Sequence, residues 1–191
     1  MNVKSLGGIG KINPEIRSLH CDSRTVEADS LFFAIQGEQT DGHLYIEKAL
    51  EQGAVAVISE RRAPGNANCP WIQIQSIRPV MAQLANTFYG LPSKDLDLIG
   101  VTGTNGKTSV SFLVHSIFEE RAPSLLMGTV HVQMGNRQLL TSLTTPDPIQ
   151  IQKRMSEAVE YGCNTGVVET SSHGIYQYRL YQCHFRVVIF T

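Results

Sequence analysis

The sequence lacks the features that mark a membrane protein, a disulfide-stabilised protein or a general nucleic-acid binder. No apolar stretch approaches the ~20 residues of a membrane-spanning helix, and residues 1–10 contain no apolar segment of signal-peptide length. Sixteen basic against seventeen acidic residues leave a net charge of -1, so no broad basic surface attracts nucleic acid. The four cysteines form no Cys-x-x-Cys pair and are expected to be free thiols. We therefore expect a soluble, cytoplasmic protein with neither nucleic-acid nor membrane partners.

Enough apolar sequence is present for a globular α/β protein. Hydrophobic residues make up 42% of the 191 positions, which can form the core of one large domain or two small ones. Apolar and alternating runs predict strands, and amphipathic segments between them predict helices. The predicted strands cover residues 31–35, 54–59, 71–75, 98–101, 124–127, 166–169 and 185–191. The predicted helices cover residues 43–52, 79–89, 107–119 and 148–161.

A domain boundary is predicted at residues 90–95, where glycine, proline and charged residues cluster between two patterned segments. This boundary divides the chain into residues 1–93 and residues 94–191. Strand, loop, helix and strand alternate after it, which is typical of a mostly parallel sheet. The prediction is a small N-terminal α/β domain followed by the first part of a second α/β domain. The final run 185–191 would leave that second sheet unfinished, because buried parallel strands need helices on both faces.

Residues 103–109 have the composition of a phosphate-binding loop between a strand and a helix. The loop consists of Gly103, Thr104, Asn105, Gly106, Lys107, Thr108 and Ser109. Glycines let backbone N–H groups approach phosphate oxygens, and the helix N-terminus adds its positive dipole end. Lys107 can reach the β- and γ-phosphates, and the Thr108 hydroxyl can bind Mg²⁺. The strict pattern has a glycine where Val101 stands, so a glycine-rich turn with a solvated lysine is the alternative.

Three further groups of polar residues are candidate ligand contacts, and the first of them lies in a polar turn after a strand. Ser23, in the polar turn 22–24, can donate to a ligand oxygen, although an Asx-turn with an exposed arginine explains the same residues. Thr145 precedes a proline and is held extended, so that Thr144 and Thr145 can meet phosphate or peptide oxygens or can cap the helix after Asp147. Glu169 ends a buried strand, where a carboxylate lies in the ligand crevice and can bind a second Mg²⁺. A salt-bridged core acid is the alternative for Glu169.

Together with this loop, four motifs resemble the Mur ligase family. They are Asp22-Ser23-Arg24, residues 37–42 (Gly-Glu-Gln-Thr-Asp-Gly), residues 144–147 (Thr-Thr-Pro-Asp) and residues 169–174 (Glu-Thr-Ser-Ser-His-Gly). The first and third are similar to the MurE type, which adds the third amino acid of the peptidoglycan stem peptide. The resemblance implies three domains: an N-terminal domain that holds the uridine nucleotide, a central ATPase domain and a C-terminal domain. This chain would cover the first domain and about half of the second.

The resemblance also implies roles for individual residues. ATP would bind loop 103–109 with Mg²⁺ at Thr108 and Glu169, and the catalytic residues would be Lys107 and Glu169. The uridine pocket would contain Cys21, Ser23, Glu38, Gln39 and Thr40. The UDP-sugar peptide would contact Thr144, Thr145, Ser171, Gln177 and Arg179. His173 stays outside the catalytic set, because a histidine at a strand-to-loop junction is at least as often structural.

The resulting hypothesis is an ATP-dependent ligase of peptidoglycan precursor synthesis. ATP would phosphorylate the D-glutamate γ-carboxylate of UDP-N-acetylmuramoyl-L-alanyl-D-glutamate, and the amine of diaminopimelate or lysine would displace the phosphate. The alternative is a truncated monomer that binds nucleotide or UDP-substrate without turnover, because the family supplies a lysine carbamate and further metal ligands later in its sequence. A P-loop protein of another class would leave the Asp-Ser-Arg and Thr-Thr-Pro-Asp motifs unexplained.

Overall fold

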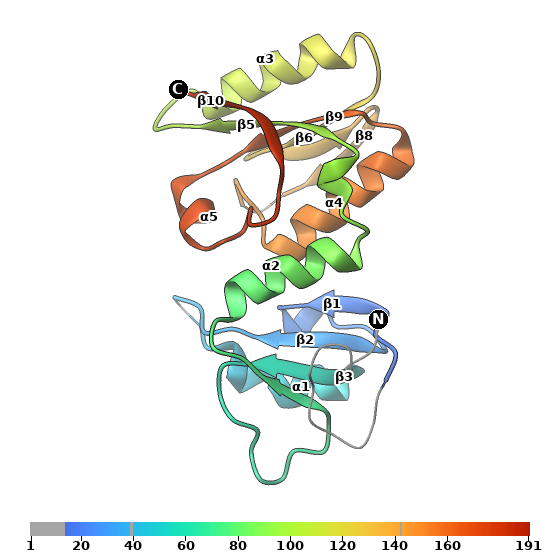
Figure 1. The fold of residues 1–191 in the computed structure, drawn as a ribbon, viewed down its shortest axis with the longest axis vertical. Coiled ribbons are helices and arrows are strands. Elements are labelled where there is room, and N and C mark those ends of the chain that lie inside the picture. The colour runs from blue at the N-terminus through green and yellow to red at the C-terminus, as the bar shows by residue number, and fades with distance from the viewer. Residues whose placement is uncertain (1–13, 39, 142) are drawn as a thin grey trace. The chain divides into compact units, whose positions relative to one another are not determined.

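The computed structural model describes residues 14–38, 40–141 and 143–191 and divides into two compact units (Figure 1). The first unit ends at Met81 and the second extends from Ala82 to Thr191. The division falls within helix α2 (Ile77–Phe88), upstream of the predicted boundary, and the limits 1–93 and 94–191 stay a prediction. Among the described residues, no helix has both the length and the apolar character to cross a bilayer.

The first unit is built on a sheet of four parallel strands. Their order follows the sequence: β1 (Ser18–His20), β2 (Ser30–Ala34), β3 (Ala54–Ser59) and β4 (Trp71–Gln73). The connections include the 3-10 turns η2 (Ser23–Thr25) and η3 (Gly42–Tyr45) and the helix α1 (Ile46–Glu51). All five residues of β2 are buried, which explains its continuous apolar run. Because the strands are parallel, the segments after β1, β2 and β3 lie at one edge of the sheet.

The second unit contains a six-stranded mixed sheet in the order β10-β5-β9-β6-β7-β8. The strands are β5 (Asp97–Thr102), β6 (Ser124–Met127), β7 (His131–Met134), β8 (Arg137–Leu140), β9 (Thr165–Glu169) and β10 (Phe185–Phe190). Strands β10, β5, β9 and β6 are parallel, whereas β7 and β8 continue the sheet as an antiparallel hairpin. The mixed α/β architecture with mostly parallel sheets is therefore confirmed.

Helices cover both faces of this second sheet (Figure 1). They are α3 (Lys107–Glu119), α4 (Pro148–Tyr161) and the short α5 (Ser172–Tyr176), with the 3-10 turn η4 (Pro92–Lys94) before β5. Ile99 and Val101 pack on the face covered by α3, and Leu98 packs on the opposite face with Ile151 and Met155 of α4. Successive residues of β5 thus point to opposite faces, and both faces are apolar.

Several of the predicted elements agree with the structure at both of their ends. Predictions for residues 107–119, 124–127 and 148–161 coincide with α3, β6 and α4. The helix predicted over residues 43–52 is wrong in its first turn, because Asp41 caps the 3-10 turn η3 and α1 begins only at Ile46. Helix α2 begins at Ile77 rather than Pro79, and β4 ends at Gln73. The prediction missed the β7–β8 hairpin and α5, whereas β1 is the strand expected before the polar turn at Asp22.

Candidate functional site

The candidate site lies where three neighbouring parallel strands of the second unit end. Strands β5, β9 and β6 are adjacent in that order. Their carboxyl ends lead into the loop at Gly103, into Glu169 and into Thr129. In open α/β sheets the crevice outside these carboxyl ends is where ligands bind. The strand order therefore brings together segments that lie far apart in the sequence.

The phosphate-binding loop has the backbone geometry that its glycines allow. Gly103 has φ 134° and Gly106, the N-cap of α3, has φ 76°, both in the region that favours glycine. No side chain caps the helix at Gly106, so its first-turn N–H groups stay open to an anion. Lys107 Nζ donates to the carbonyl oxygens of Gly103 at 2.9 Å and Thr104 at 3.4 Å. The ammonium is thus held against the loop.

Glu169 is fully buried, and its carboxylate is bonded to neutral groups. Its Oε2 accepts from the Thr108 hydroxyl at 3.2 Å and from the Thr129 hydroxyl at 2.9 Å, and its Oε1 accepts from the Thr129 N–H at 3.2 Å. Within the described part of the chain no Lys, Arg or His pairs with it, so the alternative of a salt-bridged core acid is wrong. Burying an ionised carboxylate without a cation is costly. The arrangement suits Mg²⁺, which needs only one or two carboxylates beside hydroxyl, water and phosphate oxygens.

The sequence analysis missed Gly128 and Thr129, which complete this cluster. A side chain at Gly128 would collide with Oε1 of Glu169, so a larger residue there would force the carboxylate to move. Thr129 follows directly and supplies two of the three hydrogen bonds to it. The sequence feature that could have pointed to these two residues is a glycine followed by a hydroxyl residue, directly after a predicted buried strand of the βαβ unit. That position is a strand's carboxyl end, but its closeness to Glu169 depends on the order of the strands.

Thr144 and Thr145 reach the same cluster. The buried Thr145 hydroxyl donates to the main-chain oxygen of Glu169 at 2.9 Å, lies 3.1 Å from the Ser171 hydroxyl and accepts from the Ser171 N–H at 3.1 Å. The Thr144 and Thr129 hydroxyls are 3.1 Å apart. Helix α4 is capped instead by Asp147, which accepts from the N–H groups of residues 149 and 150. Burial raises the pKa of this Asp147 carboxyl.

Arg179 and Gln177 join the cluster from the segment after α5. Arg179 Nη1 donates to the main-chain oxygen of Thr145, while its Nε and Nη2 donate to Gln177 Oε1 at 3.1 and 2.7 Å. Gln177 Nε2 lies 2.7 Å from His173 Nε2. The structure thus brings Thr145, Ser171, Gln177 and Arg179 into one hydrogen-bonded group beside Glu169. His173 contacts Gln177 in this group.

Two family patterns match most of the chain. The Mur ligase middle domain matches residues 101–191, and the pattern described as Mur ligase family, catalytic domain, matches residues 15–89. The chain belongs to the Mur ligase family.

Curated relatives of the MurE type are similar to this chain. The UDP-N-acetylmuramoyl-L-alanyl-D-glutamate--2,6-diaminopimelate ligase of Alkaliphilus metalliredigens is 39% identical over 183 residues, which is 95% of this chain and 37% of that protein. The enzyme of the same name from Halalkalibacterium halodurans is 41% identical over 180 residues, or 94% of this chain and 37% of that protein. This Mur ligase chain therefore spans little more than a third of the length of these MurE relatives.

Solved structures support the same family. A solved diaminopimelate ligase of the same name aligns with a TM-score of 0.76 and 31% identity over 92% of this chain and 36% of that chain. The MurF ligase of Thermotoga maritima, solved in complex with ADP, aligns with a TM-score of 0.57 and 24% identity over 82% of this chain and 32% of that chain. The second similarity shows a common fold alone.

The predicted uridine-pocket residues of this Mur ligase chain lie in its first unit. Cys21 and the buried Ser23 follow β1, and Glu38 and Thr40 follow the adjacent strand β2, whereas Gln39 lies outside the described residues. Asp22 accepts from the Arg24 N–H at 2.9 Å and pairs with its exposed guanidinium at 2.7 Å. The Asx-turn alternative is therefore right for these two residues, and it leaves a role for Ser23 open.

A charged network that the sequence analysis did not assign lies after β2 and β3 of this Mur ligase chain. His43 Nδ1 is 2.6 Å from Asp41 Oδ1, and its Nε2 is 2.8 Å from the buried Ser59 hydroxyl. Arg61 Nη2 donates to Asp41 Oδ2 at 2.7 Å. The hydrogen bond from His43 is the main cause that lowers the pKa of Asp41 to about 2. The network ties the loop before η3 to the end of β3.

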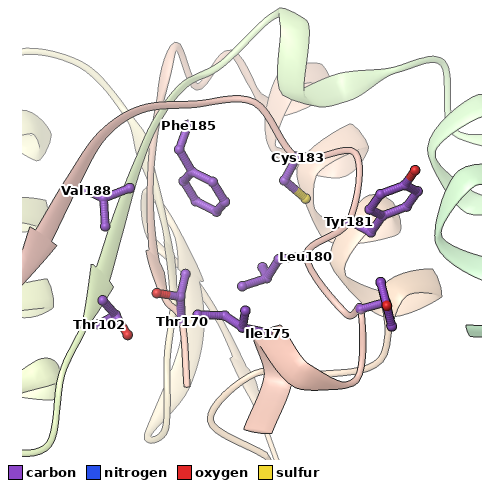
Figure 2. A pocket seen from close by; sticks show the side chains of 9 residues that line it. Thr102, Thr170, Ile175, Leu180, Tyr181, Cys183, Phe185 and Val188 are labelled. Atoms are coloured by element: carbon purple, nitrogen blue, oxygen red, sulfur yellow. The ribbon is translucent and has the colours of Figure 1, made fainter. Parts of the chain in front are cut away.

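An apolar pocket of the second unit is lined by residues from the ends of β5 and β9, from β10 and from the segment 175–183 (Figure 2). Its volume is about 410 Å³. The lining includes Ile175, Leu180, Tyr181, Cys183, Phe185 and Val188. Burial raises the pKa of the Cys183 thiol to about 12, so this cysteine is a packing residue rather than a nucleophile.

Proposed function

We propose that this chain carries the ATP-binding and UDP-substrate-binding parts of a ligase of peptidoglycan precursor synthesis. The observation that supports this most is the buried Glu169 carboxylate beside Thr108, at the start of the helix that Lys107 opens. The relatives are named for ligation of 2,6-diaminopimelate to UDP-N-acetylmuramoyl-L-alanyl-D-glutamate. The proposed domains are residues 1–93, for the UDP-substrate, and residues 94–191, for ATP.

In this proposal the phosphates of ATP bind at the start of α3. The N–H groups of the first helical turn donate to phosphate oxygens, and the helix dipole favours their negative charge. Lys107 exchanges its two carbonyl partners for the β- and γ-phosphates. The remaining loop residues, Gly103, Thr104, Asn105, Gly106, Thr108 and Ser109, shape this anion site.

Thr108 and Glu169 would hold the Mg²⁺ ion of the nucleotide. Both offer oxygen atoms, and the fully buried carboxylate supplies the negative charge that attracts a cation into this crevice. When bound, Mg²⁺ neutralises charge on the transferred phosphoryl group. Among the described residues no group of three or more His, Cys, Asp or Glu side chains forms a complete metal site, so phosphate and water oxygens would complete the coordination.

The UDP-sugar peptide would lie along Thr144, Thr145, Ser171, Gln177 and Arg179. Arg179 and Gln177 are already hydrogen-bonded to each other, which orients the guanidinium beside Glu169's strand for a carboxylate partner. The γ-phosphoryl group then moves to a substrate carboxylate oxygen as its bond to ADP breaks, giving an acyl-phosphate. An amine attacks the acyl carbon and phosphate leaves. The residues present act by positioning and charge stabilisation.

The uridine part of the substrate would bind at the edge of the first unit's sheet. Cys21, Ser23, Glu38, Gln39 and Thr40 are the proposed contacts. Ser23 and Glu38 follow neighbouring parallel strands, so their segments reach the same edge of the sheet, where ligands of parallel sheets bind.

The alternative function is binding of nucleotide or UDP-substrate without turnover. The chain spans 37% of the length of the ligases that it resembles. Two measurements separate the alternatives: binding of UDP-N-acetylmuramoyl-L-alanyl-D-glutamate, and phosphate release from ATP when this substrate and diaminopimelate or lysine are present. Release that requires both co-substrates supports the ligase. Binding without release supports the alternative, and binding of neither ATP nor UDP-substrate contradicts both.

A further inference from the structure

Thr129 contacts both the proposed cation site and the proposed substrate segment. Its N–H and hydroxyl bond to different oxygens of the Glu169 carboxylate, at 3.2 and 2.9 Å. The same hydroxyl lies 3.1 Å from the Thr144 hydroxyl. Thr129 therefore fixes the plane of a carboxylate that is fully buried, and it does so from a loop rather than from the strand that carries Glu169.

The direction of these hydrogen bonds follows from the number of protons. A threonine hydroxyl has one proton and two lone pairs, and an ionised carboxylate only accepts. The Thr129 hydroxyl is placed to donate to Glu169 Oε2 at 2.9 Å and to the Thr144 hydroxyl at 3.1 Å, and its single proton serves one of these acceptors at a time. The Thr108 hydroxyl likewise donates to Glu169. The lone pairs of Thr108 are then left to face a cation, and Thr144, which accepts from Thr129, keeps a second lone pair that can accept from a ligand N–H or O–H group.

A second connection runs through the main chain. Thr145 donates to the main-chain oxygen of Glu169 at 2.9 Å, so residues 144 and 145 both bond, directly or through Thr129, to the residue that carries the carboxylate. A shift of residues 144 and 145 on substrate binding would therefore move the carboxylate of Glu169 in two ways, through the main-chain bond of Thr145 and through Thr129. Only the route through Thr129 acts on the carboxylate oxygens themselves.

We propose that Thr129 is a positioning residue that orients Glu169 for the divalent cation and couples cation binding to a hydrogen-bond donor group of the substrate at Thr144. This rests on the proposed function, because it takes Glu169 as a cation ligand and Thr144 as a substrate contact. Partners that orient a metal ligand are typically worth roughly 10- to 100-fold in metal affinity.

The test measures ADP binding by calorimetry, with magnesium and with a chelator, for wild type, Thr129→Val and Thr129→Ser. Valine keeps the shape and the N–H but removes the hydroxyl, and serine restores the hydroxyl. We expect Thr129→Val to lose at least about tenfold of the magnesium-dependent affinity, to keep its affinity in chelator, and to be rescued by Thr129→Ser. Thr87→Val, an exposed residue of α2, is the matched control.

The coupling to Thr144 is tested with a second variant. Thr144→Val should lower magnesium-dependent affinity in the same direction, and adding it to Thr129→Val should cause no further loss, because both act on one hydrogen-bond chain. Additive losses would overturn the coupling.

Other outcomes show whether the role of Thr129 or the proposed function itself is wrong. Thr129→Val with wild-type magnesium dependence, or with equal losses in magnesium and in chelator, overturns the role of Thr129 but leaves the proposed function intact. A wild-type chain that binds no ADP under either condition overturns the proposed function, and the coupling with it. Melting temperatures of all variants separate these results from loss of folding.

Discussion

The Thr108 hydroxyl donates to Oε2 of Glu169 across 3.2 Å, although the two residues are 61 positions apart in the sequence. One stands in the first turn of α3 and the other ends β9. This contact joins the phosphate-binding loop to the buried carboxylate, and it makes a single site of two motifs.

Replacing Lys107 by alanine should weaken nucleotide binding. Charge-assisted hydrogen bonds contribute about 1.5–3 kcal/mol, so the dissociation constant of ATP should rise roughly tenfold to a hundredfold. Folding should change little, because the ammonium bonds only to loop carbonyl oxygens. Calorimetry checks this, with Lys153→Ala on the exposed side of α4 as a control of equal charge. Equal affinities for the two variants would contradict the role of Lys107.

Gly128→Ala should destabilise the second unit and disturb the cation site. The new methyl group would collide with the Glu169 carboxylate, and such overpacking costs about 1–3 kcal/mol. Urea unfolding measures the loss of stability. Gly65→Ala is the matched control, because a side chain there meets no atom within 4 Å and should be close to neutral. A Gly128→Ala variant as stable as this control would show that the close packing is not as described.

Thr145→Val should destabilise the protein by about 1–3 kcal/mol. Valine keeps the volume of threonine, but it leaves the Ser171 N–H and the Glu169 carbonyl without the partner that the hydroxyl provides. Thr87→Val, whose hydroxyl bonds only within α2, should change stability much less. Urea unfolding of both variants is the measurement, and equal midpoints would count against a structural role of the Thr145 hydroxyl.

Acid should remove the contribution of Asp41 to stability. Its pKa is about 2 in the folded protein against an ordinary 3.8, so the unfolded chain binds more protons between these values. The stabilisation is complete above about pH 4 and is lost as the pH falls from about 4 to about 2. Asp41→Asn should therefore be less stable than wild type at pH 5, and this gap should narrow towards pH 2.5. A gap that is constant with pH would contradict the lowered pKa.

Elements with local end signals could be predicted from the sequence. Asp147, Pro148 and Gly162 give the limits of α4, because an N-cap carboxylate, a first-turn proline and a glycine with φ 94° act within a few residues of their positions. The β7–β8 hairpin had a comparable signal in the two-residue turn Gly135-Asn136, which the prediction did not use. The five-residue helix α5 is too short to show helical periodicity.

The candidate site could be predicted only in part. The phosphate loop is a continuous motif, and Glu169 stands at a recognisable strand end. Thr129 was missed because its partnership with Glu169 arises from the pairing of β9 with β6, and nothing in the local sequence specifies the order of strands in a sheet. The neutral hydrogen-bond partners of Glu169 come from α3 and from the loop after β6, so they too could not be predicted from the local sequence.

The central claim is that the start of α3 and Glu169 together bind the phosphates and cation of ATP. A crystal structure of this chain with magnesium and a non-hydrolysable ATP analogue tests it most directly. We expect phosphate oxygens within hydrogen-bond distance of the N–H groups of the loop and of Lys107 Nζ, with the cation between Thr108 and Glu169. A nucleotide bound elsewhere, with this loop empty at saturating concentration, would contradict the account.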